Sequence, residues 1–260
     1  MTMSTVLKSV ENGVAILTLN RPEKFNSFNR DMALALQGHL DDCETDEQVR
    51  CIYITGSGKA FCAGQDLAEA TDPNGPEMER IVKEHYNPII QRLRKIEKPI
   101  IAAVNGVAAG AGANVALACD IVLAAESAAF IQAFSKIGLI PDSAGTYFLP
   151  RLVGMQRAAA LMMSADKVSG KEAVEMGMAF KWYADEQFEA ESRRFAAQIA
   201  QMPTKGLGLT KRLLNETYNN TLDQQLQREM AVQVEAGATY DFREGVTAFL
   251  EKRKPEFKGK

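Results

Sequence analysis

An α/β core followed by a C-terminal region of helices is the fold class that the sequence predicts. Up to about residue 140, short β-branched runs alternate with segments of helical spacing, and after Pro141 the pattern is mainly helical. Alternating strands and helices are typical of α/β folds, and helices that follow them in a block form a layer of their own. A chain of 260 residues is long enough for one large domain with such an annex.

A hairpin and a capped helix are the first predicted elements. Strand-like runs in Thr5–Asn20 flank Asn12-Gly13, and Asn-Gly between β-rich runs is a strong hairpin signal. Asn29 is a good helix N-cap and precedes apolar residues at i, i+4 and i+8. Pro88 should kink or divide a later helix, because it lacks a backbone N–H. This half is predicted to continue with a helix over 29–42, a strand over 50–55, a helix over 77–96, a strand over 99–104, a helix from near 112, and strands over 120–125 and 129–132.

The second half is predicted to be a series of helices. Helical spacing or composition covers 152–164, 170–176, 185–202, 205–218, 222–236 and 242–252. We find no repeat of fixed period and no low-complexity linker between the two halves. The change of pattern therefore sets the expected division, with residues 1–195 as the core and residues 196–260 as the helical region.

The composition is that of a globular protein. Hydrophobic residues make up 46% and charged residues 24% of the chain. The longest apolar stretch, Pro99–Ala118, is interrupted by asparagines and glycines, and no secretory signal is evident at residues 1–5. The net charge of −3 argues against a broad nucleic-acid surface. We therefore expect neither a membrane nor a nucleic acid as a partner.

The cysteines and histidines favour a reducing compartment and argue against a metal centre. Cys43, Cys51, Cys62 and Cys119 show no C-x-x-C spacing, which favours buried free thiols over a disulfide framework. The two histidines are far apart in the sequence, which argues against a histidine-based metal site. We expect a cytoplasmic protein.

Two glycine-rich turns are the strongest local motifs. Residues 61–67 read Phe-Cys-Ala-Gly-Gln-Asp-Leu, and residues 105–112 read Asn-Gly-Val-Ala-Ala-Gly-Ala-Gly. Small residues after a strand let a ligand approach the backbone, and a helix N-terminus adds favourable polarity. Taken alone, each turn is as typical of tight packing between a strand and a helix as of a ligand-binding site. A dinucleotide fingerprint is disfavoured, because Val115 stands where G-x-G-x-x-G needs a small residue.

These turns, with 20–27 and 140–146, resemble the motifs of the crotonase (enoyl-CoA hydratase/isomerase) superfamily. They occur in the family's order, and the resemblance covers residues 5–260. It implies an α/β fold in which ββα units form a crotonase-type spiral, with residues 196–260 as a helical trimerisation region. It also implies an acyl-CoA substrate, no separate cofactor because coenzyme A is part of that substrate, and a homotrimer or a dimer of trimers.

By position in the motifs, the resemblance assigns the two oxyanion donors to the backbone N–H groups of Gln65 and Ala111. Such donors stabilise the negative charge that forms on a thioester oxygen when a neighbouring proton is removed, and one can be worth about 3 to 4 kcal/mol. Many members have glycine where this chain has Ala111, which a backbone donor tolerates if φ is negative. The residues expected to contact substrate or coenzyme A are Lys24, Ala63, Gln65, Asp66, Leu67, Asn87, Asn114 and Phe134.

Two substitutions and one carboxylate bear on the reaction. Hydration needs two acid/base groups, and the family's two catalytic glutamates align with Asn114 and Phe134, neither of which exchanges protons. Asp142 is the carboxylate that is left. An aspartate in Pro-Asp-Ser is as typical of a turn or an N-cap as of a catalytic residue. The family, however, places this turn beside the acyl pocket. One carboxylate that removes a proton at one carbon and returns it at another performs an isomerisation.

Further segments resemble the phenylacetate-pathway isomerase branch, namely 86–88, 105–114, 138–146, 206–211 and 240–250. That branch converts 2-(1,2-epoxy-1,2-dihydrophenyl)acetyl-CoA to oxepin-CoA and shifts 3-enoyl-CoA double bonds. The alternatives are a fatty-acid Δ3,Δ2-enoyl-CoA isomerase, an enoyl-CoA hydratase, and an aryl-CoA dehalogenase with Asp142 as nucleophile. The dehalogenase is disfavoured, because no histidine of this chain aligns with the general-base histidine of that family. A non-catalytic RNA-binding protein of this fold would need a basic stripe, and the chain offers only its short basic ending.

Overall fold

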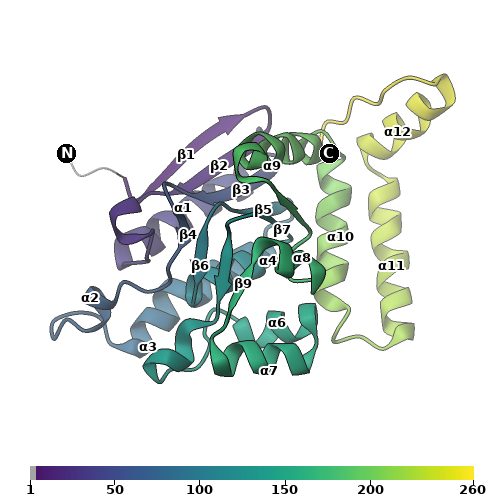
Figure 1. Cartoon of the computed structure of the whole chain (residues 1–260). Coiled ribbons are helices and arrows are strands. Elements are labelled where there is room, and N and C mark those ends of the chain that lie inside the picture. Colours follow the sequence, from purple (N-terminus) through teal and green to yellow (C-terminus); the bar gives the residue numbers. More distant parts are fainter. Residues whose placement is uncertain (1–3) are drawn as a thin grey trace.

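The computed structural model describes residues 4–260, and its core contains two β-sheets (Figure 1). In the larger sheet β1 and β2 are antiparallel, and the remaining neighbours are parallel. Asn12 and Gly13 both have positive φ in the β1–β2 turn, which confirms the predicted hairpin. The strand order is β1 (Val6–Glu11), β2 (Val14–Leu19), β3 (Cys51–Gly56), β5 (Ile100–Val104), β7 (Ile121–Ala125) and β10 (Lys181–Tyr183).

The smaller sheet consists of β4 (Ala60–Cys62), β6 (Val107–Ala109), β8 (Ala129–Ile131) and β9 (Lys167–Ser169). Along the chain, a strand of the large sheet is followed by a strand of the small sheet and then by a helical segment. This unit occurs at β3–β4, β5–β6 and β7–β8, and it confirms the predicted spiral of ββα units. Strands β4, β6, β9 and β10 were not predicted, because each has three residues and so displays no clear period; β8 is equally short but was predicted over 129–132.

Helices cover the sheets and differ from prediction mainly at glycine and proline. Asn29 Oδ1 accepts a hydrogen bond from Met32 N at 3.0 Å and begins α1, as predicted. The segment predicted as one helix over 77–96 contains a π-helical turn, and Pro88 lies in the first turn after it. Gly154 separates α6 from α7, so the helix predicted over 152–164 begins later. The bounds are η1 (Pro22–Lys24), α1 (Arg30–Thr45), α2 (Leu67–Ala70), α3 (Met78–Arg80), η2 (Ile81–Tyr86), α4 (Asn87–Lys95), α5 (Ala111–Leu117), η3 (Ala133–Ile137), α6 (Gly145–Val153), α7 (Met155–Ser164), α8 (Gly170–Glu175) and α9 (Asp185–Ala200).

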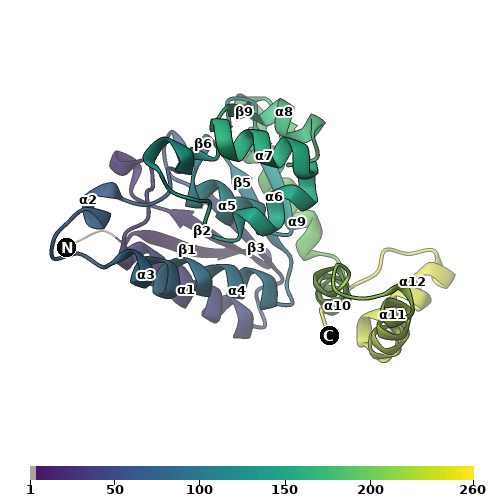
Figure 2. The same cartoon turned by 90° about the horizontal axis from the view of Figure 1, so that it is seen from below.

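Three further helices, α10 (Thr204–Glu216), α11 (Leu222–Gly237) and α12 (Tyr240–Glu251), stand to one side of the core (Figure 2). The expected division between residues 1–195 and 196–260 falls inside α9 and stays a prediction. All four cysteines are buried and free, as expected. No helix in residues 4–260 is long and apolar enough to span a membrane.

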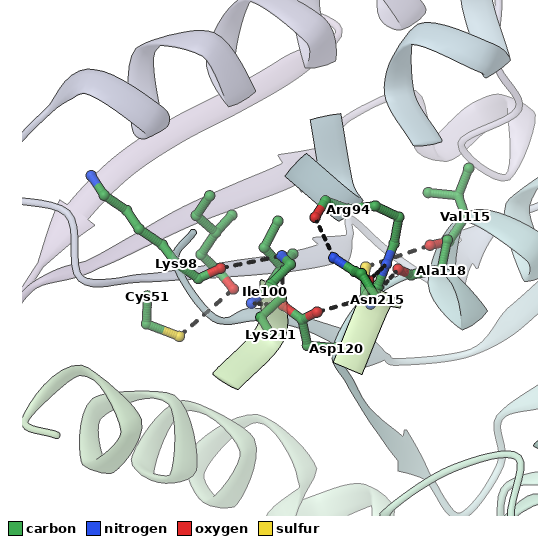
Figure 3. A network of polar contacts seen from close by, with 11 residues as sticks. Cys51, Arg94, Lys98, Ile100, Val115, Ala118, Asp120, Lys211 and Asn215 are labelled. Atoms are coloured by element: carbon green, nitrogen blue, oxygen red, sulfur yellow. Dashed lines mark hydrogen bonds and ion pairs between the residues drawn. The ribbon is translucent and has the colours of Figure 1, made fainter. Parts of the chain in front are cut away.

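A buried polar network attaches α10 to the core (Figure 3). Lys211 of α10 is 6% exposed, and its Nζ lies 2.8 Å from Asp120 Oδ2. Asp120 also accepts hydrogen bonds from Arg94 and from the backbone N–H of Ile100. Asn215 of α10 donates from Nδ2 to Arg94 O at 2.9 Å. Because a buried charge is costly unless it is paired and hydrogen-bonded, this network holds α10 in one position.

Candidate active site

The two glycine-rich turns lie against each other. They follow β4 and β6, which are parallel neighbours in the small sheet. A Cβ on Gly64 would stand 2.9 Å from Ala109 O and 3.4 Å from Ala111 N, and Gly64 has a φ of +92°. Only glycine fits this close approach without strain. Strand pairing and a glycine therefore bring residues 64 and 111 together although they are far apart in the sequence.

Each turn presents one backbone N–H that no protein acceptor takes up within residues 4–260. Phe28 N donates to Gly64 O and Asp66 N donates to Phe28 O, so this pairing uses the residues on either side of Gln65 and leaves its own N–H free. Ala111 is the first residue of α5, where a helix has no internal partner for its N–H. The geometry supplies two backbone donors in adjacent turns, at the two residues that the motifs indicated.

The side chain of Gln65 belongs to a chain of hydrogen bonds that was not predicted. Tyr86 Oη donates to Gln65 Oε1 at 2.7 Å, and Gln65 Nε2 donates to Glu69 Oε2 at 3.0 Å. Glu69 Oε1 accepts in turn from Arg30 N at 2.9 Å. Tyr86 is fully buried, and it is the last residue of the π-helical segment η2. These contacts hold the first turn through the side chain of Gln65. No periodicity in the sequence indicated Tyr86 or Glu69.

Asp142 lies in the segment between η3 and α6, and burial raises its pKa to about 6. The Ser143 hydroxyl donates to Asp142 Oδ1 at 2.9 Å and partly offsets this shift. Helix α6 begins at Gly145 with Ala144 as its N-cap residue and without a side-chain cap, so the Asp142 carboxylate does not cap it. Burial is the main cause of the raised pKa of Tyr86, and Asp142 is among the charges that add to it. Asp142 is connected to α5 through Asn114, and its raised pKa is suited to accepting and returning a proton.

Asn114 and Phe134, which occupy the positions of the family's glutamates, also surround the second turn. Asn114 is fully buried, and its Nδ2 donates to Asp142 O at 2.8 Å. Its Oδ1 accepts from Gln132 Nε2 at 2.8 Å. The Phe134 ring would lie 3.8 Å from a Cβ on Gly110. An amide and an aromatic ring thus fill these two positions, and neither can act as an acid or base.

Comparison with known proteins decides the family. The enoyl-CoA hydratase/isomerase family model matches residues 9–260. This chain belongs to that family. It is 49% identical to the 1,2-epoxyphenylacetyl-CoA isomerase of Escherichia coli K12, over 99% of this chain and 100% of the relative. It is 33% identical to the trans-2-decenoyl-[acyl-carrier-protein] isomerase of Streptococcus mutans, over the full length of both. The crystal structure of an enoyl-CoA hydratase from Polaromonas sp. JS666 matches with a TM-score of 0.90 and 34% identity, covering 97% of this chain and 99% of that one.

Family membership confirms the predicted resemblance, the α/β crotonase-type fold and the expectation of an enzyme that acts on acyl-CoA thioesters. The remaining predicted contacts with substrate or coenzyme A stay predictions. Lys24 in η1 and Leu67 at the start of α2 are exposed, whereas Ala63 is half-buried. Asp66 accepts from Ala68 N and pairs with Arg21 at 2.8 Å, so its carboxylate holds the turn. Asn87 is exposed at the start of α4.

A cavity of about 1080 Å³ lies elsewhere, between α4, α6 and α10. It is lined by Ile90, Phe148, Leu214 and Tyr218 among others, and none of the three predicted catalytic residues reaches it. No three His, Cys, Asp or Glu side chains in residues 4–260 lie close enough together to hold a metal ion.

Proposed function

We propose that this enzyme is an acyl-CoA isomerase that uses an oxyanion hole and one carboxylate. The observation that carries the proposal is the half-buried Asp142, whose pKa burial raises to about 6 and whose carbonyl is bound by Asn114 of the helix that begins with Ala111; Asn114 and Phe134 stand where a hydratase needs its glutamates. The relative named 1,2-epoxyphenylacetyl-CoA isomerase supports 2-(1,2-epoxy-1,2-dihydrophenyl)acetyl-CoA as the substrate and oxepin-CoA as the product, in phenylacetate catabolism.

In the proposed mechanism the substrate carbonyl oxygen accepts hydrogen bonds from the N–H groups of Gln65 and Ala111. The Asp142 carboxylate removes a proton from the carbon next to the thioester carbonyl, and the two donors stabilise the enolate that results. With a 3-enoyl-CoA, the enolate electrons move the double bond into conjugation, and protonated Asp142 returns the proton two carbons further on. With the epoxide, the same electrons open the strained ring system, and the proton returns to a ring carbon.

The assembly is part of the same proposal. The exposed apolar faces of α11 and α12 would pack against a second copy of this chain, forming a homotrimer or a dimer of trimers. Leu222 and Phe249 are 74% and 83% exposed in the single chain, which is unusual for residues of their size. The enzyme would work in the cytoplasm, and it would need no cofactor because coenzyme A arrives as part of the substrate.

Asp142→Asn tests the mechanism. Asparagine has almost the same shape but cannot exchange protons, so conversion of 3-enoyl-CoA to 2-enoyl-CoA should fall by about 100- to 10,000-fold. Mass spectrometry of the epoxyphenylacetyl-CoA reaction with the same variant shows whether the ring expansion shares this base. A folded variant that isomerises 3-enoyl-CoA at the wild-type rate would mean that Asp142 is only a turn residue.

Crotonyl-CoA distinguishes this proposal from a hydratase. With no acid/base group at residues 114 and 134, water addition should be far slower than the roughly 10 per second of a typical enzyme. Turnover at that rate would contradict the proposed function. Inactivity towards every CoA ester, together with RNA binding that weakens steadily with salt, would instead support the binding-protein alternative.

A further inference from the structure

The segment that carries Asp142 is strained. Ser143 and Ala144 follow it with φ values of 50° and 57°, two consecutive non-glycine residues in the left-handed region. This conformation is unfavourable for a residue with a side chain. Backbone strain of this kind persists only where surrounding contacts hold it, and it is concentrated at functional sites. Contacts from the surrounding structure must therefore hold residues 142–145, which we call the Asp142 turn.

Asn114 contacts this turn from helix α5. Its Nδ2 donates to Asp142 O at 2.8 Å, and the same carbonyl accepts from Gly145 N at 2.9 Å. A Cβ on Gly145 would lie 2.3 Å from Asn114 Nδ2, so only glycine leaves room for the amide. Asn114 is in the helix that begins with Ala111. The amide thus connects the turn of the proposed base to the helix of a proposed oxyanion donor.

Gln132 fixes the orientation of Asn114. Because Asp142 O can only accept, Asn114 must direct its NH₂ group towards the turn and its Oδ1 away from it. That Oδ1 accepts from Gln132 Nε2 at 2.8 Å. Gln132 is 4% exposed, and within residues 4–260 its Oε1 has no partner. A buried acceptor without a partner is unfavourable, and Gln132 nevertheless keeps the orientation in which its Nε2 donates to Asn114 Oδ1.

We propose that Gln132 and Asn114 are positioning residues that hold the strained Asp142 turn, and with it the Asp142 carboxylate, in register with the two oxyanion turns. We call the two hydrogen bonds that run from Gln132 through Asn114 to Asp142 O the amide chain. This inference rests on the proposed function, since the group it positions is the proposed base. It also assigns Asn114 a different role from the substrate contact that the sequence motifs indicated, because both ends of its amide are occupied by protein groups.

Asn114→Ala and Gln132→Met test the amide chain, and Asn215→Ala is the matched control. Asn215 also donates from Nδ2 to a backbone carbonyl and accepts at Oδ1 from a side chain, Arg94, but it does so on α10. A displacement of about 1 Å can cost about 100-fold in rate. Asn114→Ala should therefore lower kcat for 3-enoyl-CoA by about 10- to 100-fold with KM within about twofold of wild type, whereas Asn215→Ala should keep kcat. A raised KM with unchanged kcat would mean direct substrate binding and would overturn the proposal.

Double variants separate positioning from general destabilisation. If the chain acts through the carboxylate, Asn114→Ala should cause no further loss in an Asp142→Asn background, and Gln132→Met should cause none in an Asn114→Ala background. Contacting residues that act as one unit give such non-additive effects, whereas independent residues add. Additive losses in both cycles would overturn the amide chain. Gln132→Met also removes the unsatisfied oxygen, so this variant is expected to fold.

One readout does not depend on turnover. The Asp142 carboxyl can be followed by carbon-13 NMR titration, with the resonance assigned by its absence in Asp142→Asn. In Asn114→Ala the turn relaxes towards solvent, so the pKa should move from about 6 towards the ordinary value of 3.8; in Asn215→Ala it should stay. An unchanged titration in Asn114→Ala would contradict positioning by Asn114. If the wild-type protein isomerises no CoA ester but the Asp142 pKa still shifts in Asn114→Ala, the proposed function is rejected and the amide chain is kept.

Discussion

At the scale of single residues, burial decides what Asp142 can do. An aspartate after proline and before serine is equally suited to a turn and to proton transfer. In the structure the carboxylate caps no helix, accepts from the Ser143 hydroxyl and has a pKa raised to about 6 by burial. A raised pKa makes a carboxylate a stronger base than an exposed aspartate, at a cost in stability once it ionises.

That cost gives a pH-dependent prediction for Asp142→Asn. The folded pKa of about 6 lies above the ordinary 3.8, so the stability linked to the bound proton is fully present below about pH 4 and is lost as the pH rises through about 6. At pH 8 the ionised carboxylate should cost about 2 to 3 kcal/mol. We expect Asp142→Asn to melt about 4 to 8 °C above wild type at pH 8, with the difference shrinking as the pH approaches 4. Calorimetry across this range checks it, and a constant difference would mean that the carboxyl is not buried.

At the scale of elements, two short strands create the proposed oxyanion hole. Strands β4 and β6 contain three residues each, yet their pairing brings the turns that follow them into contact at Gly64 and Ala109. Helix α5 adds the polarity of its N-terminus at Ala111. The donors belong to the backbone, so the position of the elements, rather than the identity of the side chains, determines where they point.

Ala111→Pro tests this view of α5. Proline is tolerated in the first turn of a helix, so the variant should fold while losing only the N–H at this position. Loss of one oxyanion donor costs about 100- to 1,000-fold, and exchange of the substrate's α-protons into deuterated water should slow by that factor while CoA-ester binding persists. The measurements are the exchange rate and a binding isotherm. Undiminished exchange would place the donor elsewhere.

At the scale of the whole molecule, the chain consists of a core with the site and a helical region beside it (Figure 2). The polar network of Lys211, Asp120 and Arg94 fixes the first of these helices to the core. Further out, Asp241 accepts from the N–H groups of Lys258 and Gly259, so the C-terminal segment is held against α12. The outer helices are therefore ordered in the single chain although they expose large apolar side chains.

Phe249→Asp tests whether these side chains pack against a second copy. A charge at a buried apolar interface is strongly unfavourable, so the variant should sediment near the 28.5 kDa of one chain, whereas wild type should sediment at about three or six times that mass. Met163→Asp, at a 78% exposed position on α7, is the matched control and should keep the assembly. Wild-type protein that sediments as a monomer would reject the proposed trimer.

Features that depend on neighbours along the chain could be predicted from the sequence. The hairpin at Asn12-Gly13, the cap at Asn29 and the interrupted helix at Pro88 all follow from local backbone preferences. The family motifs around Gln65, Ala111 and Asp142 could also be recognised, because each is a short contiguous run.

Which distant residues meet depends on how the whole core packs, and the sequence patterns did not predict it. The pairing of β4 with β6, the contact of Tyr86 with Gln65 and the bond between Gln132 and Asn114 each join residues separated by many positions. Such contacts leave no period in the local sequence, because they are chosen by packing of the whole core rather than by the propensity of any one segment. The role of Asn114 shows the difference: its position in a motif suggested the substrate, and its two hydrogen bonds connect it to Asp142 and Gln132.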